Sequence, residues 1–126
     1  MKKKLAFLLF TGIILSGCST IAENSLETGK GSMELLTPTI TTKDNELEIK
    51  TEGIDENKVT FIYVANKKVL AQKIKNGESY KVNIKDIEHA HRTDYKPKVQ
   101  LLQTKDDTQD GDMVTFKQVR YTVKKN

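Results

Sequence analysis

The strongest constraint on the fold is a two-residue alternation of apolar and polar side chains that runs through most of the chain. It is clearest at residues 80–85, where Tyr80, Val82 and Ile84 alternate with polar residues. Successive side chains of a β-strand point to opposite faces of its sheet, so this period predicts a strand with one buried face. No strong helical period follows residue 34, so we expect an all-β domain.

Turn residues divide the alternating part of the chain into seven expected strands. Segment 59–65 is apolar on both faces and rich in β-branched and aromatic residues, which predicts a central strand. Pro38 marks an edge position because it cannot donate to a strand ladder. The alternation slips between Gln118 and Val119, as it does at a β-bulge. The expected strands are 34–41, 46–51, 59–65, 68–74, 80–85, 95–104 and 113–124.

The core of the expected domain is formed by side chains on the apolar sides of these segments. Ile54, in a loop, is expected to plug one end of the core. Residues 86–93 break the alternation, and we expect one helical turn there, across the end of the sheets. The expected core residues are Phe61, Tyr63, Val82, Ile84, Val99, Leu101 and Tyr121.

Short strands at this spacing resemble the immunoglobulin-like and fibronectin-III-like folds, which are β-sandwiches. The resemblance is carried by Tyr80-Lys-Val-Asn-Ile84, a turn, and Tyr95-Lys-Pro-Lys-Val-Gln-Leu101. In those folds a tyrosine near the start of the sixth strand forms the tyrosine corner, and the resemblance gives that role to Tyr95. It covers about residues 34–124, without the family's cysteines or tryptophan. It implies a seven-stranded sandwich and no particular function.

The start of the chain has a different pattern. A basic start, Lys2-Lys-Lys4, precedes an apolar run over residues 5–15 and the tetrapeptide Leu15-Ser-Gly-Cys18. Such an order is typical of a secretory signal peptide, and the run is shorter than the roughly 20 apolar residues that a membrane span needs. The tetrapeptide resembles the lipobox of bacterial lipoproteins. The resemblance implies that the Cys18 thiol receives a diacylglyceryl group and that signal peptidase cuts between Gly17 and Cys18.

The lipobox predicts three parts of the chain. Residues 1–17 form the signal peptide, residues 18–33 the lipidated cysteine and a flexible tether of small and polar residues, and residues 34–126 the sandwich. Two acyl chains hold a protein stably on a bilayer. We therefore expect an anchor in the membrane through diacylglyceryl-Cys18, at the extracellular face of the cell. Cys18 is the only cysteine, so the core alone must hold the fold.

The charge of the expected mature chain argues against a nucleic-acid partner. The full chain has 21 Lys and Arg residues against 17 Asp and Glu residues, for a net charge of +4, and loss of the three signal-peptide lysines leaves +1. A domain with this balance has no net field that attracts nucleic acid.

Two side-chain groups are weighed as metal sites. His89 and His91 are the only histidines, and an extended segment would place both on one face, where Glu88 or Asp94 could complete a zinc or copper site. The alternative is a solvated loop pair, and this is what we expect.

The second group is an acidic cluster near the C-terminus, with oxygen ligands of the kind that calcium takes. The EF-hand spacing is absent, and no glutamate closes the loop. We therefore expect an acidic hairpin connection that charge keeps soluble. The cluster consists of Asp106, Asp107, Asp110 and Asp112.

No catalytic constellation is visible in the sequence. It lacks the Gly-x-Ser-x-Gly and glycine-rich phosphate-loop motifs, and its only cysteine lies in the lipobox. We expect a non-enzymatic surface lipoprotein, without a cofactor, that presents its sandwich to a surface protein partner not identified by the sequence.

The signal peptide adds a more particular resemblance. Phe10-Thr-Gly-Ile-Ile-Leu-Ser-Gly17 resembles the octapeptide sex pheromones of enterococci, and the layout is similar to small lipoproteins of staphylococcal conjugative plasmids. This implies a link to conjugative transfer and release of a pheromone-like peptide. Two other classes stay open: an exclusion lipoprotein that blocks phage entry or mating, and a metal-binding or hydrolytic lipoprotein.

Overall fold

A computed structural model describes residues 27–125, which form β-strands, turns and loops without a helix. The all-β prediction is confirmed for this part of the chain, while the signal peptide, Cys18 and residues 18–26 of the tether lie outside the described residues. Residues 86–93, expected to hold a helical turn, form hydrogen-bonded turns instead. None of the structure between residues 27 and 125 is a helix long and apolar enough to span a membrane. The strands are β1 (Ser32–Leu35), β2 (Thr39–Thr41), β3 (Glu46–Glu52), β4 (Thr60–Val64), β5 (Lys67–Gln72), β6 (Ser79–Asn83), β7 (Lys98–Thr104), β8 (Met113–Arg120) and β9 (Thr122–Lys124).

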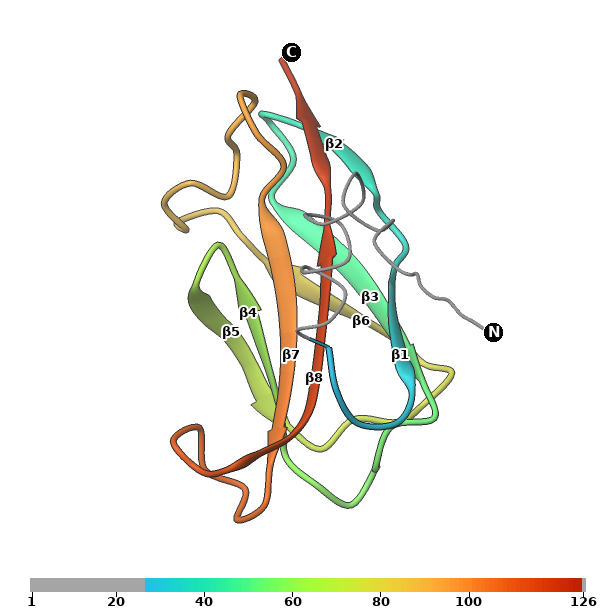
Figure 1. Ribbon diagram of the computed structural model, residues 1–126. Coiled ribbons are helices and arrows are strands. Elements are labelled where there is room, and N and C mark those ends of the chain that lie inside the picture. The colour runs from blue at the N-terminus through green and yellow to red at the C-terminus, as the bar shows by residue number, and fades with distance from the viewer. Residues whose placement is uncertain (1–26, 126) are drawn as a thin grey trace, which may run out of the picture.

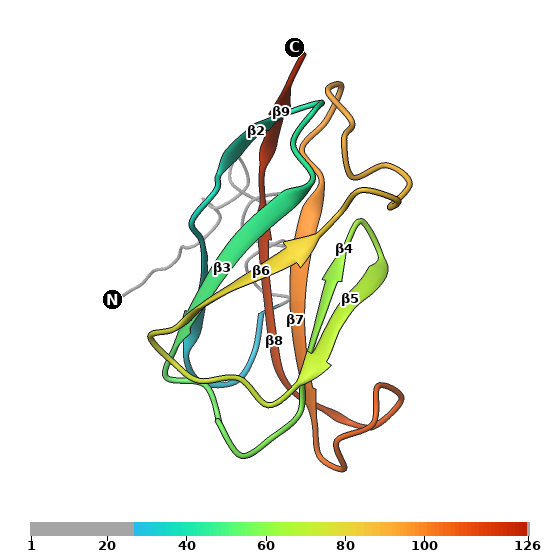
Figure 2. The ribbon, with the colours of Figure 1, turned by 180° about the vertical axis from the view of Figure 1, so that it is seen from behind.

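Two larger sheets face each other in a sandwich-like arrangement (Figure 1). One has the order β1-β3-β6, the other the order β5-β4-β7-β8, and β2 and β9 form a third, two-stranded sheet. Figure 2 shows β3 and β6 lying across β7 and β8. The core between the two sheets includes Leu47 and Ile49 of β3 together with Val99 and Leu101 of β7, all fully buried.

The described residues contain nine strands where seven were expected, because the first and last expected strands are each divided in two. The first breaks around Pro38: β1 pairs antiparallel with β3, and β2 then pairs parallel with β9. The last breaks at Tyr121, between β8 and β9. Both breaks accompany a change of sheet, which an alternation of apolar residues does not reveal.

The register of β4 differs from the prediction. Ile62 and Val64, each 0% exposed, point into the core. Phe61 is buried, as expected, but lies outside the core cluster, on the opposite face of its sheet. Tyr63 is only half-buried, so its assignment to the core is wrong. A strand that is apolar on both faces gives no sequence signal for which set points inward.

The other expected core residues are correctly placed. Val82, Ile84, Val99, Leu101 and Tyr121 are all buried. The expected plug, Ile54, is also buried, at 3% exposure.

The β-bulge expected between Gln118 and Val119 is absent. Pairing of β7 with β8 runs without interruption from Phe116 to Arg120, and the irregularity lies earlier, between Gln103 and Thr104. The apolar residues change sides because Phe116 lies on the outer face of the sheet, opposite Leu102. The slip in the sequence pattern therefore marks a second apolar face and not an inserted residue.

The described end of the expected tether is attached to the domain. Thr28 pairs with Phe116 through two backbone hydrogen bonds of 3.0 Å. The backbone amide of Gln118 donates to the Glu27 carboxylate, also at 3.0 Å. Gly29 adopts a φ of +82°, and a Cβ there would lie 2.5 Å from the Val114 carbonyl oxygen, so only glycine fits. Residues 27–29 therefore cover the free edge of β8.

The register of β4 predicts unequal effects of truncating two neighbouring residues. Ile62→Ala should lower the free energy of unfolding by about 2–5 kcal/mol, because it opens a cavity in the core. Tyr63→Ala should cost clearly less, since its ring is half-exposed. Urea denaturation of both variants measures the difference, and a larger loss from Tyr63→Ala would contradict the observed register.

Candidate functional site

The longest loop at one end of the sandwich joins β6 to β7 and spans residues 84–97 (Figure 1). Two turns shape its first half: the Ile87 amide donates to the Ile84 carbonyl and the Ala90 amide to the Ile87 carbonyl, both at 3.2 Å. Ala90 is 0% exposed, and its carbonyl accepts a 2.6 Å hydrogen bond from the Tyr121 hydroxyl. The loop is therefore fixed to the core at Ala90.

Tyr121, and not Tyr95, makes the tyrosine-to-backbone hydrogen bond at this end of the sandwich. Burial raises the pKa of the Tyr121 phenol, so the hydroxyl stays protonated and able to donate. Tyr95 is 48% exposed, and the guanidinium of Arg92 lies 4.7 Å from its ring centroid. The tyrosine-corner prediction for Tyr95 is wrong, because a tyrosine at the β8–β9 junction fills the buried position.

His89 and His91 have different hydrogen-bond partners. The His91 Nε2 donates to the Asp44 carbonyl at 2.7 Å, which fastens the loop to the connection between β2 and β3. His89 has a left-handed backbone (φ 74°), and its Nδ1 accepts from the Arg92 Nη1 at 3.3 Å. Because the segment is turned and not extended, Glu88 lies close to His89, with 3.6 Å between the carboxylate and Nε2. Within residues 27–125 no group of three or more His, Cys, Asp or Glu side chains could hold a metal ion.

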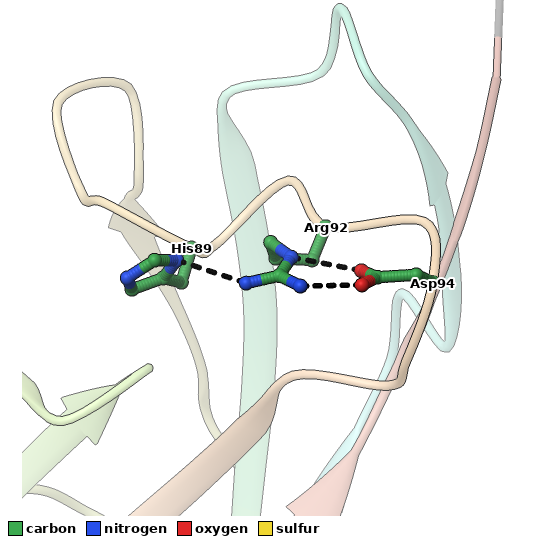
Figure 3. Close-up of polar contacts among 3 residues, drawn as sticks. All are labelled: His89, Arg92 and Asp94. Carbon is green, nitrogen blue, oxygen red and sulfur yellow. Dashed lines mark hydrogen bonds and ion pairs between the residues drawn. The ribbon is translucent and has the colours of Figure 1, made fainter.

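Arg92 forms the centre of a short chain of polar contacts (Figure 3). Its Nε donates to Asp94 Oδ1 at 2.8 Å, its Nη2 donates to Asp94 Oδ2, and its Nη1 faces His89. Hydrogen bonding from Arg92 lowers the pKa of Asp94, and Asp94 in turn raises the pKa of Arg92. The pair therefore persists at pH values where an isolated aspartate is already protonated. Asp94, weighed above as a metal ligand, binds Arg92 instead.

The acidic loop between β7 and β8 uses its carboxylates to hold its own shape. Asp106 Oδ1 accepts from the Thr108 hydroxyl at 2.9 Å, and this bond contributes most to the lowered pKa of Asp106. Asp107 Oδ1 accepts from the Val59 amide at 3.1 Å, which ties the loop to the start of β4. The loop is a hairpin connection between antiparallel strands, as expected.

A pocket of about 250 Å³ opens beside the β6–β7 loop, and three cationic side chains line it: Lys96, Lys98 and Arg120. Sequence reasoning missed all three. Lys96 and Lys98 carry a visible signal, since alternate residues of an extended segment share a face. Arg120 carries none, because its place opposite Lys98 follows only from the β7–β8 register.

No protein-family model, curated protein or solved structure matches this chain. The β6–β7 loop combines a fixed attachment, through Ala90, with exposed charged and aromatic side chains, including Tyr95. Such groups on a loop held by a rigid scaffold form many binding sites. We take this loop as the candidate functional site.

The bond between Tyr121 and Ala90 predicts a stability effect. Tyr121→Phe should lower the free energy of unfolding by about 1–3 kcal/mol, because it leaves the buried Ala90 carbonyl without its donor. Tyr95→Phe is the matched control and should change it by less than about 0.5 kcal/mol, as at other exposed positions. Thermal or urea unfolding of the two variants tests this, and equal effects would show that the buried hydroxyl contributes nothing.

Proposed function

We propose that the protein is a lipoprotein that is anchored at the extracellular face of the cell membrane and binds a protein partner with its sandwich domain. The observation that carries the proposal is the tetrapeptide Leu15-Ser-Gly-Cys18 behind a basic start and an apolar run. A diacylglyceryl group on Cys18 would supply the two acyl chains that stable anchoring requires. The function is binding and not catalysis.

We further propose that the domain belongs to the immunoglobulin-like and fibronectin-III-like class. The strand order supports this: lettered in the immunoglobulin manner, the sheets are A-B-E and C′-C-F-G. The divided first strand also supports it: β1 pairs with β3 of the three-stranded sheet, and β2 pairs with β9, which directly follows β8 in the chain. Sandwiches of this class are common in cell-surface proteins that bind other proteins.

The attachment of residues 27–29 to β8 keeps the domain close to its anchor. Nine peptide links separate Cys18 from Glu27. Fully extended, such a segment reaches about 30 Å. The proposed partner therefore lies in the membrane or within a short distance of it.

The β6–β7 loop has side chains suited to binding a protein. Arginine and tyrosine are enriched among the residues that dominate binding energy at interfaces. Arg92 and Tyr95 are stacked, and Asp94 orients the guanidinium. These contacts already restrict the conformations of the two side chains, so less conformational entropy is lost when a partner binds.

The anchor is tested by Cys18→Ala. This variant should leave the membrane fraction and accumulate as uncleaved precursor or in the medium, because the thiol that carries the lipid is gone. Ser16→Ala is the matched control, since alanine is also small, and it should stay in the membrane fraction at mature size. Immunoblots of cell fractions measure both, and unchanged membrane retention and mature size for Cys18→Ala would contradict lipidation.

The binding loop is tested by a pull-down from solubilised membranes with the tethered protein as bait. The wild-type protein should recover a protein that Arg92→Ala/Tyr95→Ala recovers poorly. Met113→Ala is the control, because Met113 is also exposed, at 51%, but lies at the opposite end of the sandwich. Equal recovery by all three proteins would contradict a role of the β6–β7 loop.

A further inference from the structure

We propose that the pocket beside the β6–β7 loop binds a phosphate group. It has a volume of about 250 Å³ and lies where the β4–β5 turn, the start of β7 and the end of β8 meet. Its lining includes His89 and Tyr95 of the loop together with Lys96, Lys98 and Arg120. This site goes beyond the proposed protein-binding function and depends neither on that function nor on Cys18.

The fold brings the three cationic residues together from separate segments. Lys98 and Arg120 are directly paired across β7 and β8, so their side chains share one face. The Arg120 Nη1 donates to the Lys96 carbonyl at 2.7 Å, which fixes the guanidinium beside the loop. The Ala65 amide donates to the Lys98 carbonyl at 3.0 Å, which holds the β4–β5 turn beside β7, and Ala65 and Asn66 of this turn also line the pocket.

The charge of the pocket is of one sign. Among the described residues that line it, three are cationic and none carries a carboxylate. Two carboxylates of the loop lie near the lining residues: Asp94 is hydrogen-bonded to Arg92, and Glu88 lies 3.6 Å from the Nε2 of His89. Like charges around a concave surface add their potentials, and an anion in the pocket reduces their mutual repulsion.

The donors of the pocket favour phosphate over a carboxylate. Lysine and arginine side chains only donate, and the Asn66 amide and the Tyr95 hydroxyl add further donors. A phosphate has oxygens in a tetrahedral arrangement and can accept from several directions, while a carboxylate has two oxygens in one plane. A phosphate presents more oxygens to the three cationic side chains of the pocket than a carboxylate does, and each oxygen can accept a charge-assisted hydrogen bond.

The test is a titration of the full chain in a non-ionic detergent with inorganic phosphate, at an ionic strength held constant with sodium chloride. Amide resonances of Lys96, Lys98 and Arg120 should shift and saturate in ¹H–¹⁵N spectra. Acetate at the same concentration should leave them unchanged. Equal shifts with acetate, or the absence of saturable shifts with both inorganic phosphate and the phosphatidylglycerol micelles described below, would overturn the proposal.

Matched variants locate the site. Lys96→Gln/Lys98→Gln should weaken phosphate binding by about tenfold or more, because two charge-assisted donors are lost. Lys96→Arg/Lys98→Arg should retain it. Lys73→Gln/Lys75→Gln removes the same charge from exposed positions beyond the other end of β5 and should also retain it. Equal weakening by the two glutamine variants would overturn the proposal. The loss of binding would then come from the lower net charge of the protein and not from the pocket.

Detergent micelles that contain a short-chain phosphatidylglycerol distinguish the source of the phosphate, with phosphatidylcholine as the control lipid. Shifts of the same amides with both inorganic phosphate and phosphatidylglycerol assign the site to the phosphate group itself. Shifts with phosphatidylglycerol alone assign it to a lipid head group. Equal shifts with the two lipids, without a response to inorganic phosphate, would contradict recognition of an anionic phosphate.

Discussion

The arrangement of both sheets depends on a change of partner within residues 36–38. The Leu36 amide still donates to the Glu48 carbonyl of β3, at 2.7 Å. Two residues later, the Pro38 carbonyl accepts from the backbone amide of Thr122, in β9, at 2.9 Å. Proline cannot donate, so the ladder with β3 ends there. The Thr37 hydroxyl accepts from the Glu48 amide of β3, at 3.0 Å, and so gives this amide a partner at the switch. On one flank of the sandwich, β1 and β8 are the outer strands of the two larger sheets, and β5 and β6 are the outer strands on the other.

The four-stranded sheet has a polar row on its inner face and an apolar row on its outer face. Inside, the buried Gln103 amide donates to the Thr60 hydroxyl and to the Asp55 carbonyl, both at 2.9 Å. Outside, Phe61 lies in one row with Leu102 and Phe116. A buried amide with specific partners favours one register over its neighbours, since a shift by one residue breaks its hydrogen bonds and moves it to the other face.

The sequence predicts well the strands that have one apolar face, such as β3 and β6. It predicts poorly which side chains point inward in strands with two apolar faces, β4 and β8. In these strands the alternation does not distinguish the inner face of the sheet from the outer one. The site was predicted less well than the fold. A turn was expected over residues 86–93, but its form was not, because His89 takes a left-handed conformation that is uncommon for residues other than glycine. Likewise, the approach of Arg120 to Lys96 follows from strand pairing, which joins residues far apart in the chain.

The pairing of Thr28 and β2 with the last two strands joins segments that lie far apart in the sequence. Thr28 pairs with Phe116, and β2 pairs with β9, so the N-terminal segments have these partners only when the C-terminal strands are present. Contacts of such long sequence separation form slowly, because the loop that they close is nearly the whole domain. If the chain is exported N-terminus first, as the proposed function implies, Thr28 and β2 would have no partners until β8 and β9 had crossed the membrane. We therefore expect Thr28 and β2 to pair only in the final step of folding.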